Sequence, residues 1–153
     1  MVTSAELRCR LLCNLTFKLR NVYLERRDEK WLADALFMAT AAVEATTLVD
    51  SAPDTNGGDS FKSSALLGLA NVLKSQYQLH GTFETLEKAI ETIQEAIQLE
   101  SQKPFTDLRQ RAGYLNQLAL MMRLRYMKTG EINDIDAGIQ QIKNFLDAFP
   151  DGE

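Results

Sequence analysis

The chain has 153 residues, of which 45% are hydrophobic and 25% are charged, a composition typical of one globular domain with a buried core. Its net charge of −4 argues against sequence-independent binding of nucleic acid, which depends on an excess of Lys and Arg. No apolar run approaches the ~20 residues of a membrane-spanning helix, and the N-terminus MVTSAELRCR lacks the apolar segment of a secretory signal. We therefore expect a cytoplasmic protein that binds neither nucleic acid nor membrane.

Apolar residues recur three and four positions apart along most of the chain, which predicts amphipathic helices. In chain order the pattern predicts six of them, at about 5–26, 30–48, 62–80, 83–100, 107–129 and 132–149, and no strand. The stretch DSAPDTNGGDS, residues 50–60, is rich in Pro, Gly, Asn, Asp and Ser and predicts a mobile loop. The expected fold class is all-α, with residues 1–153 in one domain.

Two of the turns between these helices contain a glycine, Gly81 or Gly130, at a place where a helix C-terminus favours a left-handed residue. The turn between the first two helices has Arg27 at the equivalent place. Because a residue with a Cβ is disfavoured in the left-handed conformation, we expect this first turn to close differently.

Alignment of the chain with itself shows an internal repeat. Shifts of 54 and then 49 residues superimpose nine small or apolar positions in three copies. These positions are Leu12, Leu15, Leu19, Tyr23, Leu32, Ala35, Leu36, Ala42 and Val43; Leu66, Leu69, Leu73, Tyr77, Leu86, Ala89, Ile90, Ala96 and Ile97; and Leu115, Leu118, Met122, Tyr126, Ile135, Gly138, Ile139, Phe145 and Leu146. The copies span about 5–49, 60–101 and 107–150, and a period near 50 residues predicts a solenoid.

The second helix of each copy resembles the tetratricopeptide (TPR) pattern of a small residue, a large one four later and another small one. Those residues are Ala35, Ala39 and Ala42; Ala89, Ile93 and Ala96; and Gly138, Ile142 and Phe145. Pro150 follows at the distance where the family often places its closing proline, and the first helices contain the Leu-x-x-Leu-Ala element as LLGLA and LNQLA. This resemblance implies a right-handed α-solenoid of three antiparallel helix pairs that serves as a protein-binding scaffold.

The chain departs from the family pattern in two ways. Ala70 and Ala89 are 19 residues apart, so each first helix is longer by about two turns than in the standard repeat. Leucine replaces the family's tryptophan in all three copies, at Leu12, Leu66 and Leu115. The longer form is similar to arrays found beside CHAT protease-like or NLR nucleotide-binding domains. An array excised from such a signalling protein is therefore one alternative.

Three equivalent positions on the first helices are basic, Arg20, Lys74 and Arg123, although the chain is acidic overall. The first helices line the concave face in TPR arrays, so we expect this basic row to lie in a groove. Neighbouring positions there hold Phe17, Asn71 and Leu120, and then Asn21, Ser75 and Leu124. Such a groove would suit an acidic, partly apolar peptide or a C-terminal carboxylate. The alternative is a solvated cationic row without a partner.

No motif for catalysis or for metal binding is present. The chain has no P-loop, G-x-G-x-x-G, H-E-x-x-H or Ser-centred elbow, and its single histidine, His80, is far in sequence from Cys9 and Cys13. The two cysteines share one helix face, and we expect reduced, partly buried thiols. Acidic residues at 131–136 suit the first turn of a helix better than a metal site. We expect no enzyme activity, no cofactor and no metal.

The two ends of the array lead to separate expectations. The first helix is apolar around much of its circumference, through Leu7, Leu11, Leu12, Leu15, Phe17, Leu19, Val22 and Leu24. Part of this surface should be exposed, so the alternative to a peptide scaffold is a homodimer formed through this helix.

At the other end, Phe145 is too large for the close contact that Ala42 and Ala96 allow. The last helix has an outer polar side with Asp136, Gln140, Asn144 and Asp147. We expect the array to end there, with Phe145 buried in its own chain.

Overall fold

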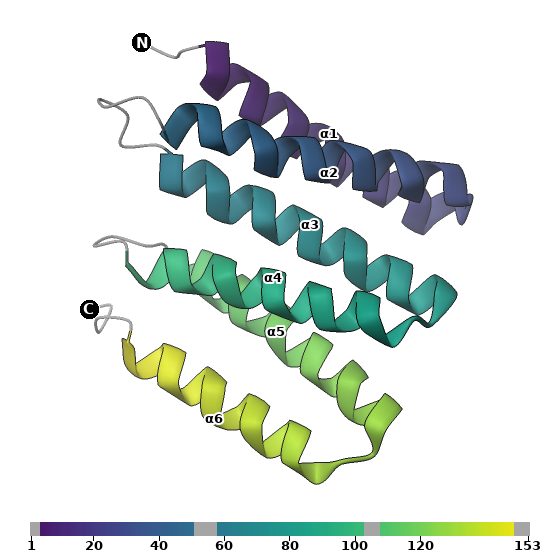
Figure 1. Cartoon of the computed structure of the whole chain (residues 1–153), viewed down its shortest axis with the longest axis vertical. Helices are drawn as coiled ribbons and strands as arrows, with labels where there is room; N and C mark the ends of the chain where they lie inside the picture. The colour runs from purple at the N-terminus through teal and green to yellow at the C-terminus, as the bar shows by residue number, and fades with distance from the viewer. Residues whose placement is uncertain (1–3, 51–57, 103–107, 149–153) are drawn as a thin grey trace.

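The computed structural model describes residues 4–50, 58–102 and 108–148, without the side chains of 48–50, 58–60, 108, 145 and 148. Six α-helices account for nearly all of these residues: α1 (Ser4–Arg26), α2 (Glu29–Asp50), α3 (Gly58–His80), α4 (Phe83–Ser101), α5 (Leu108–Thr129) and α6 (Ile132–Ala148). No strand occurs in the described ranges, so the all-α class is confirmed. Consecutive helices alternate in direction and stack from α1 at one end to α6 at the other (Figure 1).

The predicted helix boundaries agree with the observed ones to within four residues. The predicted loop at 50–60 was too long, because α2 continues through Asp50 and α3 already begins at Gly58. Residues 51–57 of that loop, and the side chain of Phe145, lie outside the described residues.

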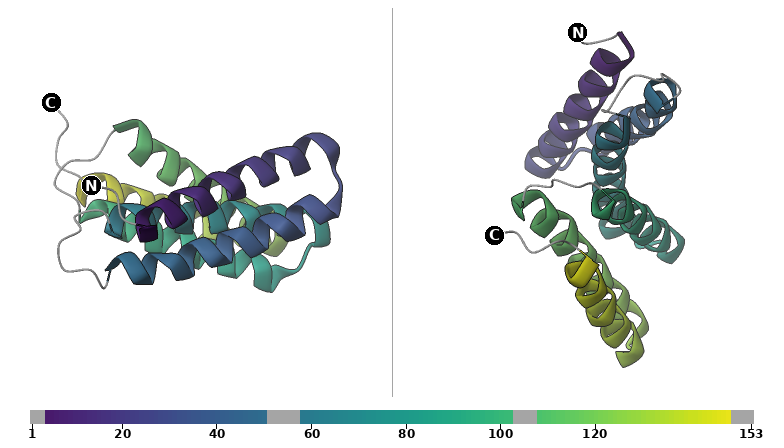
Figure 2. Two further views of the ribbon diagram at one scale, coloured as in Figure 1. Left: turned by 90° about the horizontal axis from the view of Figure 1, so that it is seen from above. Right: turned by 90° about the vertical axis from the view of Figure 1, so that its left-hand side faces the viewer.

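Neighbouring helices in the sequence are neighbours in space. Each helix contacts the next, α3 also contacts α1 and α5, and α4 also contacts α6. Among the described residues α1 and α5 do not contact each other, so α3 lies between them. The right-hand view of Figure 2 shows α1 and α6 at opposite ends of the stack. One side of the molecule is therefore formed by the odd-numbered helices, with α3 in the middle.

Most of the described repeat positions are buried or half-buried, whereas Leu15, Ile139 and Leu146 are exposed, and burial is greatest in the middle of the stack. The largest cluster of buried residues combines α3, α4 and α5, and it includes Leu66, Leu73, Leu86, Ile90, Ile93, Ile97, Leu115, Leu118 and Met122. A second cluster joins Tyr23 of α1, Val72 of α3 and Leu32, Ala35 and Ala39 of α2. Ala42 and Ala96 are both buried, as expected for sites where the next helix approaches closely. The self-alignment of the sequence thus identified much of the core.

The three turns α1–α2, α3–α4 and α5–α6 close in the same way, which corrects the expectation for Arg27. Arg27 has φ 58°, close to the 72° of Gly81 and the 70° of Gly130. In each turn this residue's N–H donates to the carbonyl of the tyrosine four residues earlier, at 2.7, 2.6 and 2.7 Å. The guanidinium of Arg27 also lies 5.8 Å from the ring centre of Tyr23, a cation–π contact that offsets part of the cost of the left-handed backbone. Repeat geometry prevails here over the local preference of arginine.

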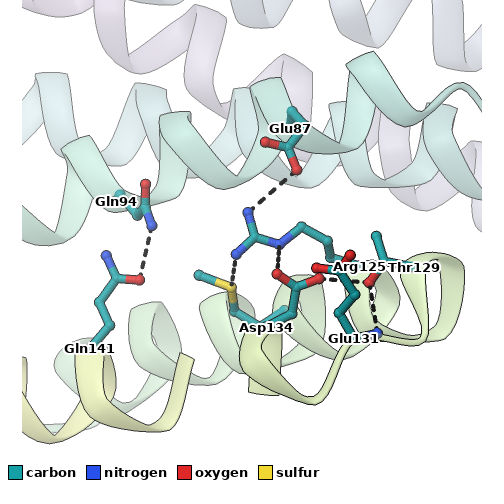
Figure 3. Close-up of polar contacts among 8 residues, drawn as sticks. Glu87, Gln94, Arg125, Thr129, Glu131, Asp134 and Gln141 are labelled. Atoms are coloured by element: carbon teal, nitrogen blue, oxygen red, sulfur yellow. Dashed lines mark hydrogen bonds and ion pairs between the residues drawn. The ribbon is translucent and has the colours of Figure 1, made fainter. Parts of the chain in front are cut away.

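Polar side chains hold α6 against α4 and α5 (Figure 3). Nη1 of Arg125 lies 3.3 Å from Oε1 of Glu87 on α4, and its Nε lies 3.6 Å from Oδ1 of Asp134 on α6. Further along the same helices, Nε2 of Gln94 donates to Oε1 of Gln141 at 2.9 Å. The Arg125 side chain is only 19% exposed, so these ion pairs are less screened by water than surface pairs. Arg125 therefore joins three helices.

Candidate functional site

Three of the predicted site residues share the side of the molecule formed by the odd-numbered helices. Phe17 on α1, Asn71 on α3 and Leu120 on α5 occupy equivalent repeat positions, and all three keep some exposure to solvent. Phe17 is 65% exposed, which is unusual for so large an apolar side chain. Two turns later on the same helix sides lie Leu24 and Gln78, both exposed. We call these five residues the odd-helix surface.

Leu24 and Gln78 were not among the predicted site residues, although the sequence contains a signal for them. Each lies seven residues after a predicted site residue, Phe17 or Asn71, and seven residues return a helix to nearly the same side. Together with Tyr23, Arg27 and Ser75, they line a cavity of about 180 Å³ between the ends of α1 and α3. That volume is below the ~300 Å³ of typical small-molecule sites. It suits a single side chain of a larger partner.

The basic row does not line this surface as expected. Lys74 is only 8% exposed, and its Nζ donates to Oε1 of Gln117 on α5 at 2.8 Å. Nε of Arg20 likewise donates to Oγ of Ser75 on α3, at 3.2 Å. Each of these cations therefore reaches the next odd-numbered helix, and the alternative of a solvated row does not hold for Lys74. Arg123 is exposed, since no described helix follows α5 on that side.

Burial changes the pKa values of two residues in the basic row, Arg20 and Lys74. Burial lowers the pKa of Arg20 below its ordinary value. Burial, and secondly the nearby charge of Arg20, lower the pKa of Lys74 from 10.5. Both shifts have the sign expected when a cation loses hydration. Because Arg20 is half-buried and Lys74 is buried, both side chains present less of their charge to solvent than the sequence suggested.

The remaining predicted residues lie on the opposite edge of each odd-numbered helix. Ser75 is buried and accepts the hydrogen bond from Arg20, so it faces the preceding odd-numbered helix. Leu124, its equivalent on α5, packs against the central core cluster. Asn21, the equivalent on α1, is half-buried. Of the nine predicted site residues, only Phe17, Asn71 and Leu120 therefore belong to the odd-helix surface.

Asn71 has a polar atom that the described protein does not satisfy. Its Oδ1 is shielded from water and accepts no hydrogen bond from the described residues. An unpaired buried amide oxygen typically costs ~1–3 kcal/mol, so such groups call for an explanation. Because the residue as a whole is half-buried, a rotation of its amide would bring this oxygen to the surface, where a peptide N–H of a partner could satisfy it. Phe17 and Leu120 occupy the equivalent positions on the two flanking helices, α1 and α5.

A second cavity lies on the other side of the molecule and was not predicted. Its volume is about 360 Å³, and it lies between α2 and α4 above α3. Leu36, Leu69 and Leu73 contribute apolar lining, with Glu84 and Lys88 among the polar residues. The lining contains no histidine or cysteine, and we assign it no chemistry.

The thiols and acidic residues offer little for chemistry. Cys9 is buried, Cys13 is half-buried, and neither forms a disulfide bond, as predicted. Burial, and secondly the charge of Cys9, raise the pKa of Cys13 to about 11, so this thiol remains protonated at neutral pH and is a poor nucleophile. Within the described ranges no three residues of the types His, Cys, Asp and Glu come together as a metal site would require. None of the described helices has the length and apolar character needed to cross a bilayer.

Comparison of the chain with protein-family models, with curated proteins and with solved structures gave no match. Evidence on function therefore comes from the odd-helix surface and from the helices at the two ends of the stack.

Proposed function

We propose that this protein is a non-catalytic, cytoplasmic scaffold that binds a peptide or protein segment on the odd-helix surface. The observation that carries the proposal is Asn71, whose amide oxygen has no donor among the described residues, while the equivalent positions on α1 and α5 hold the exposed Phe17 and the half-buried Leu120. A partner segment that crosses the three helices would bury Phe17 and Leu120 and donate an N–H to Asn71. Burial of one large apolar side chain contributes ~1.5–3 kcal/mol, so Phe17 and Leu120 would each supply part of the binding free energy.

We further propose that the six helices form a right-handed, TPR-like solenoid of three antiparallel pairs. Support comes from the three turns that share a left-handed residue, and from Arg20 and Lys74, which each reach the following odd-numbered helix. In stacked helix pairs the side formed by equivalent helices is an extended binding surface. The preference for an acidic partner is weaker than the sequence suggested, because Arg20 and Lys74 are partly withdrawn from that surface.

Selection from a library of displayed random peptides tests the binding proposal before any natural partner is identified. We expect selected peptides to carry apolar anchors and to bind Phe17→Ser and Asn71→Ala about tenfold more weakly than wild type. Phe37→Ser is the matched control, because Phe37 is an equally exposed phenylalanine on α2, away from the odd-helix surface. The three variants should keep the helical circular dichroism of wild type.

Either of two results would contradict the binding proposal. Selected peptides that bind Phe17→Ser and Asn71→Ala as tightly as wild type would exclude the odd-helix surface. An equal loss of affinity in Phe37→Ser would show that the peptides recognise exposed phenylalanine in general.

A further inference from the structure

The α6 end of the stack presents apolar side chains that the repeat covers elsewhere. Ile139 is 48% exposed, whereas its equivalent on α4, Ile90, is 2% exposed. Leu146 is likewise exposed, although its equivalent, Ile97, is fully buried in the same core cluster as Leu118 of α5. The difference arises because α5 packs on α4, whereas no described helix packs on α6 in the same way. We call Ile139 and Leu146 the tail face.

The α1 end of the stack also exposes apolar side chains at positions that are covered in other copies. Leu11 is 61% exposed, whereas its equivalent on α3, Ala65, is 2% exposed. Leu15 is exposed too, although Leu69 at the same repeat position packs against the cluster that contains α2 residues. Inside the stack, this side of an odd-numbered helix packs on the preceding even-numbered helix. We call Leu7, Leu11 and Leu15 the head face.

The two faces therefore consist of positions that contact each other between consecutive helix pairs inside the stack. If the head face of one copy packed on the tail face of another, it would repeat the contact that α3 makes with α2 and that α5 makes with α4. The charges of the two end helices also favour this pairing. α1 carries five basic and two acidic residues, whereas α6 carries one basic and three acidic residues. Contact between two α1 helices would bring like charges together, and contact between α1 and α6 joins opposite charges.

We infer that copies of this chain associate head to tail, with the head face of one copy packed on the tail face of the next. Such a contact is heterologous and does not close by itself, so it produces open chains of varying length rather than a symmetric dimer. The inference goes beyond the binding of a segment on the odd-helix surface and does not depend on it. It differs from a homodimer formed through α1 because both ends of the stack take part.

The inference also gives Arg123 a partner. Arg20 and Lys74, its equivalents, bond to Ser75 and Gln117 on the next odd-numbered helix. On α1 the positions equivalent to these two acceptors hold asparagine, at Asn21 and Asn14 respectively. In the head-to-tail contact Arg123 would reach one of these amides in the following copy. The basic row would then join all consecutive odd-numbered helices, within and between copies.

One residue of α1 weakens the contact. Lys18 stands where α3 has Val72 and α5 has Met121, both fully buried. The lysine stem can cover apolar surface while its ammonium group remains in water. The junction between copies should therefore be weaker than the internal junctions. Lys18→Val should tighten association about tenfold, because it restores an apolar side chain at a covered position.

Sedimentation analysis from about 1 µM to about 1 mM tests the inference. The wild-type mass should rise above the 17.2 kDa of one chain without a plateau at the dimer. Leu11→Lys spoils the head face and Ile139→Lys spoils the tail face, so each variant alone should remain monomeric. An equimolar mixture of the two should form a 1:1 dimer and stop there, since each variant retains one intact face. Both positions are exposed, so circular dichroism should not change.

The same experiment separates the competing outcomes. Loss of association in Leu11→Lys but not in Ile139→Lys would establish a dimer through α1 and overturn the inference. A wild-type chain that stays at 17.2 kDa over the whole range, with no association in Lys18→Val, would also overturn it. A mixture of the two variants that remains monomeric would show that the two faces do not pair.

Discussion

Replacement of Gly81 by alanine tests the shared turn of the three repeats most directly. Gly81 has φ 72°, and a Cβ built on it would find no atom within 4 Å, so no steric clash contributes to the effect. A residue with a Cβ costs ~1–2 kcal/mol in the left-handed conformation. Alanine also restricts the unfolded chain, which offsets ~0.4–1 kcal/mol of that cost. Gly81→Ala should therefore lower the free energy of unfolding by ~1 kcal/mol and the Tm by about 2–4 °C.

Urea unfolding followed by far-ultraviolet circular dichroism measures this change. Gly113→Ala is the matched control, because Gly113 is exposed within α5 and a Cβ there also finds no atom within 4 Å. Its backbone is helical, so alanine should instead stabilise the protein by ~0.5–1 kcal/mol. The same substitution should therefore lower the free energy of unfolding at Gly81 and raise it at Gly113. If both variants shift the unfolding midpoint in the same direction, the assignment of strain to the turn is refuted.

Three further substitutions test the packing and electrostatics of the stack. Ala96→Phe should lower the free energy of unfolding by ~1–3 kcal/mol, because Ala96 is fully buried where α5 approaches α4. For Lys74, the folded-state pKa lies below 10.5, so the unfolded state binds more protons as the pH approaches 10.5 from below. The free energy of unfolding of wild type, relative to Lys74→Met, should therefore rise with pH in that range. Arg125→Met should cost ~1–2 kcal/mol, and amide hydrogen exchange should locate the loosening in α6, since Glu87 and Asp134 lose their shared cation.

Each of these three predictions has a defined contrary result. An unchanged Tm in Ala96→Phe would mean that the helices do not approach closely there. A flat difference between wild type and Lys74→Met from about pH 8 to the ordinary lysine pKa of 10.5 would show that the amine is not desolvated. For Arg125→Met the control is Arg123→Met, an exposed arginine two residues earlier on α5. Equal effects of these two substitutions would indicate a general effect of charge rather than the contacts of Arg125.

The helices and much of the core were predictable because both depend on periodicity within one helix. A stripe of apolar residues three and four apart identifies the buried side, and its recurrence after 54 and 49 residues shows which stripes are equivalent. That reasoning located Leu66, Ile90 and Leu118, all buried in the central cluster. It could not predict the conformation of Arg27, because the identity of a residue gives only its average backbone preference. The packing of two neighbouring helices determined that turn.

The candidate site was predicted less well for a related reason. Periodicity shows that Phe17 and Arg20 lie on nearby parts of one helix, but it does not show which part faces a neighbouring helix and which faces water. Three residues along a helix correspond to a rotation of about 300°, so a displacement of about 60° around the axis separates a surface residue from one at a helix junction. Arg20 and Lys74 lie on the junction side of that boundary, and Phe17 and Asn71 lie on the surface side.

The same distinction explains why the exposed residues at the two ends differ from the exposed residues on the odd-helix surface. Asn71 and Phe17 lie at a position that remains partly open in all three copies, so solvent or a partner meets that position throughout the stack. Ile139 and Leu11 lie at positions that are buried at Ile90 and Ala65, so their exposure arises because no described helix packs on them, not because the repeat leaves these positions open. The odd-helix surface could therefore bind a partner of any shape that fits across three helices. For the end positions the partner can be inferred from the chain itself, because the buried equivalents show which side of a neighbouring helix packs there.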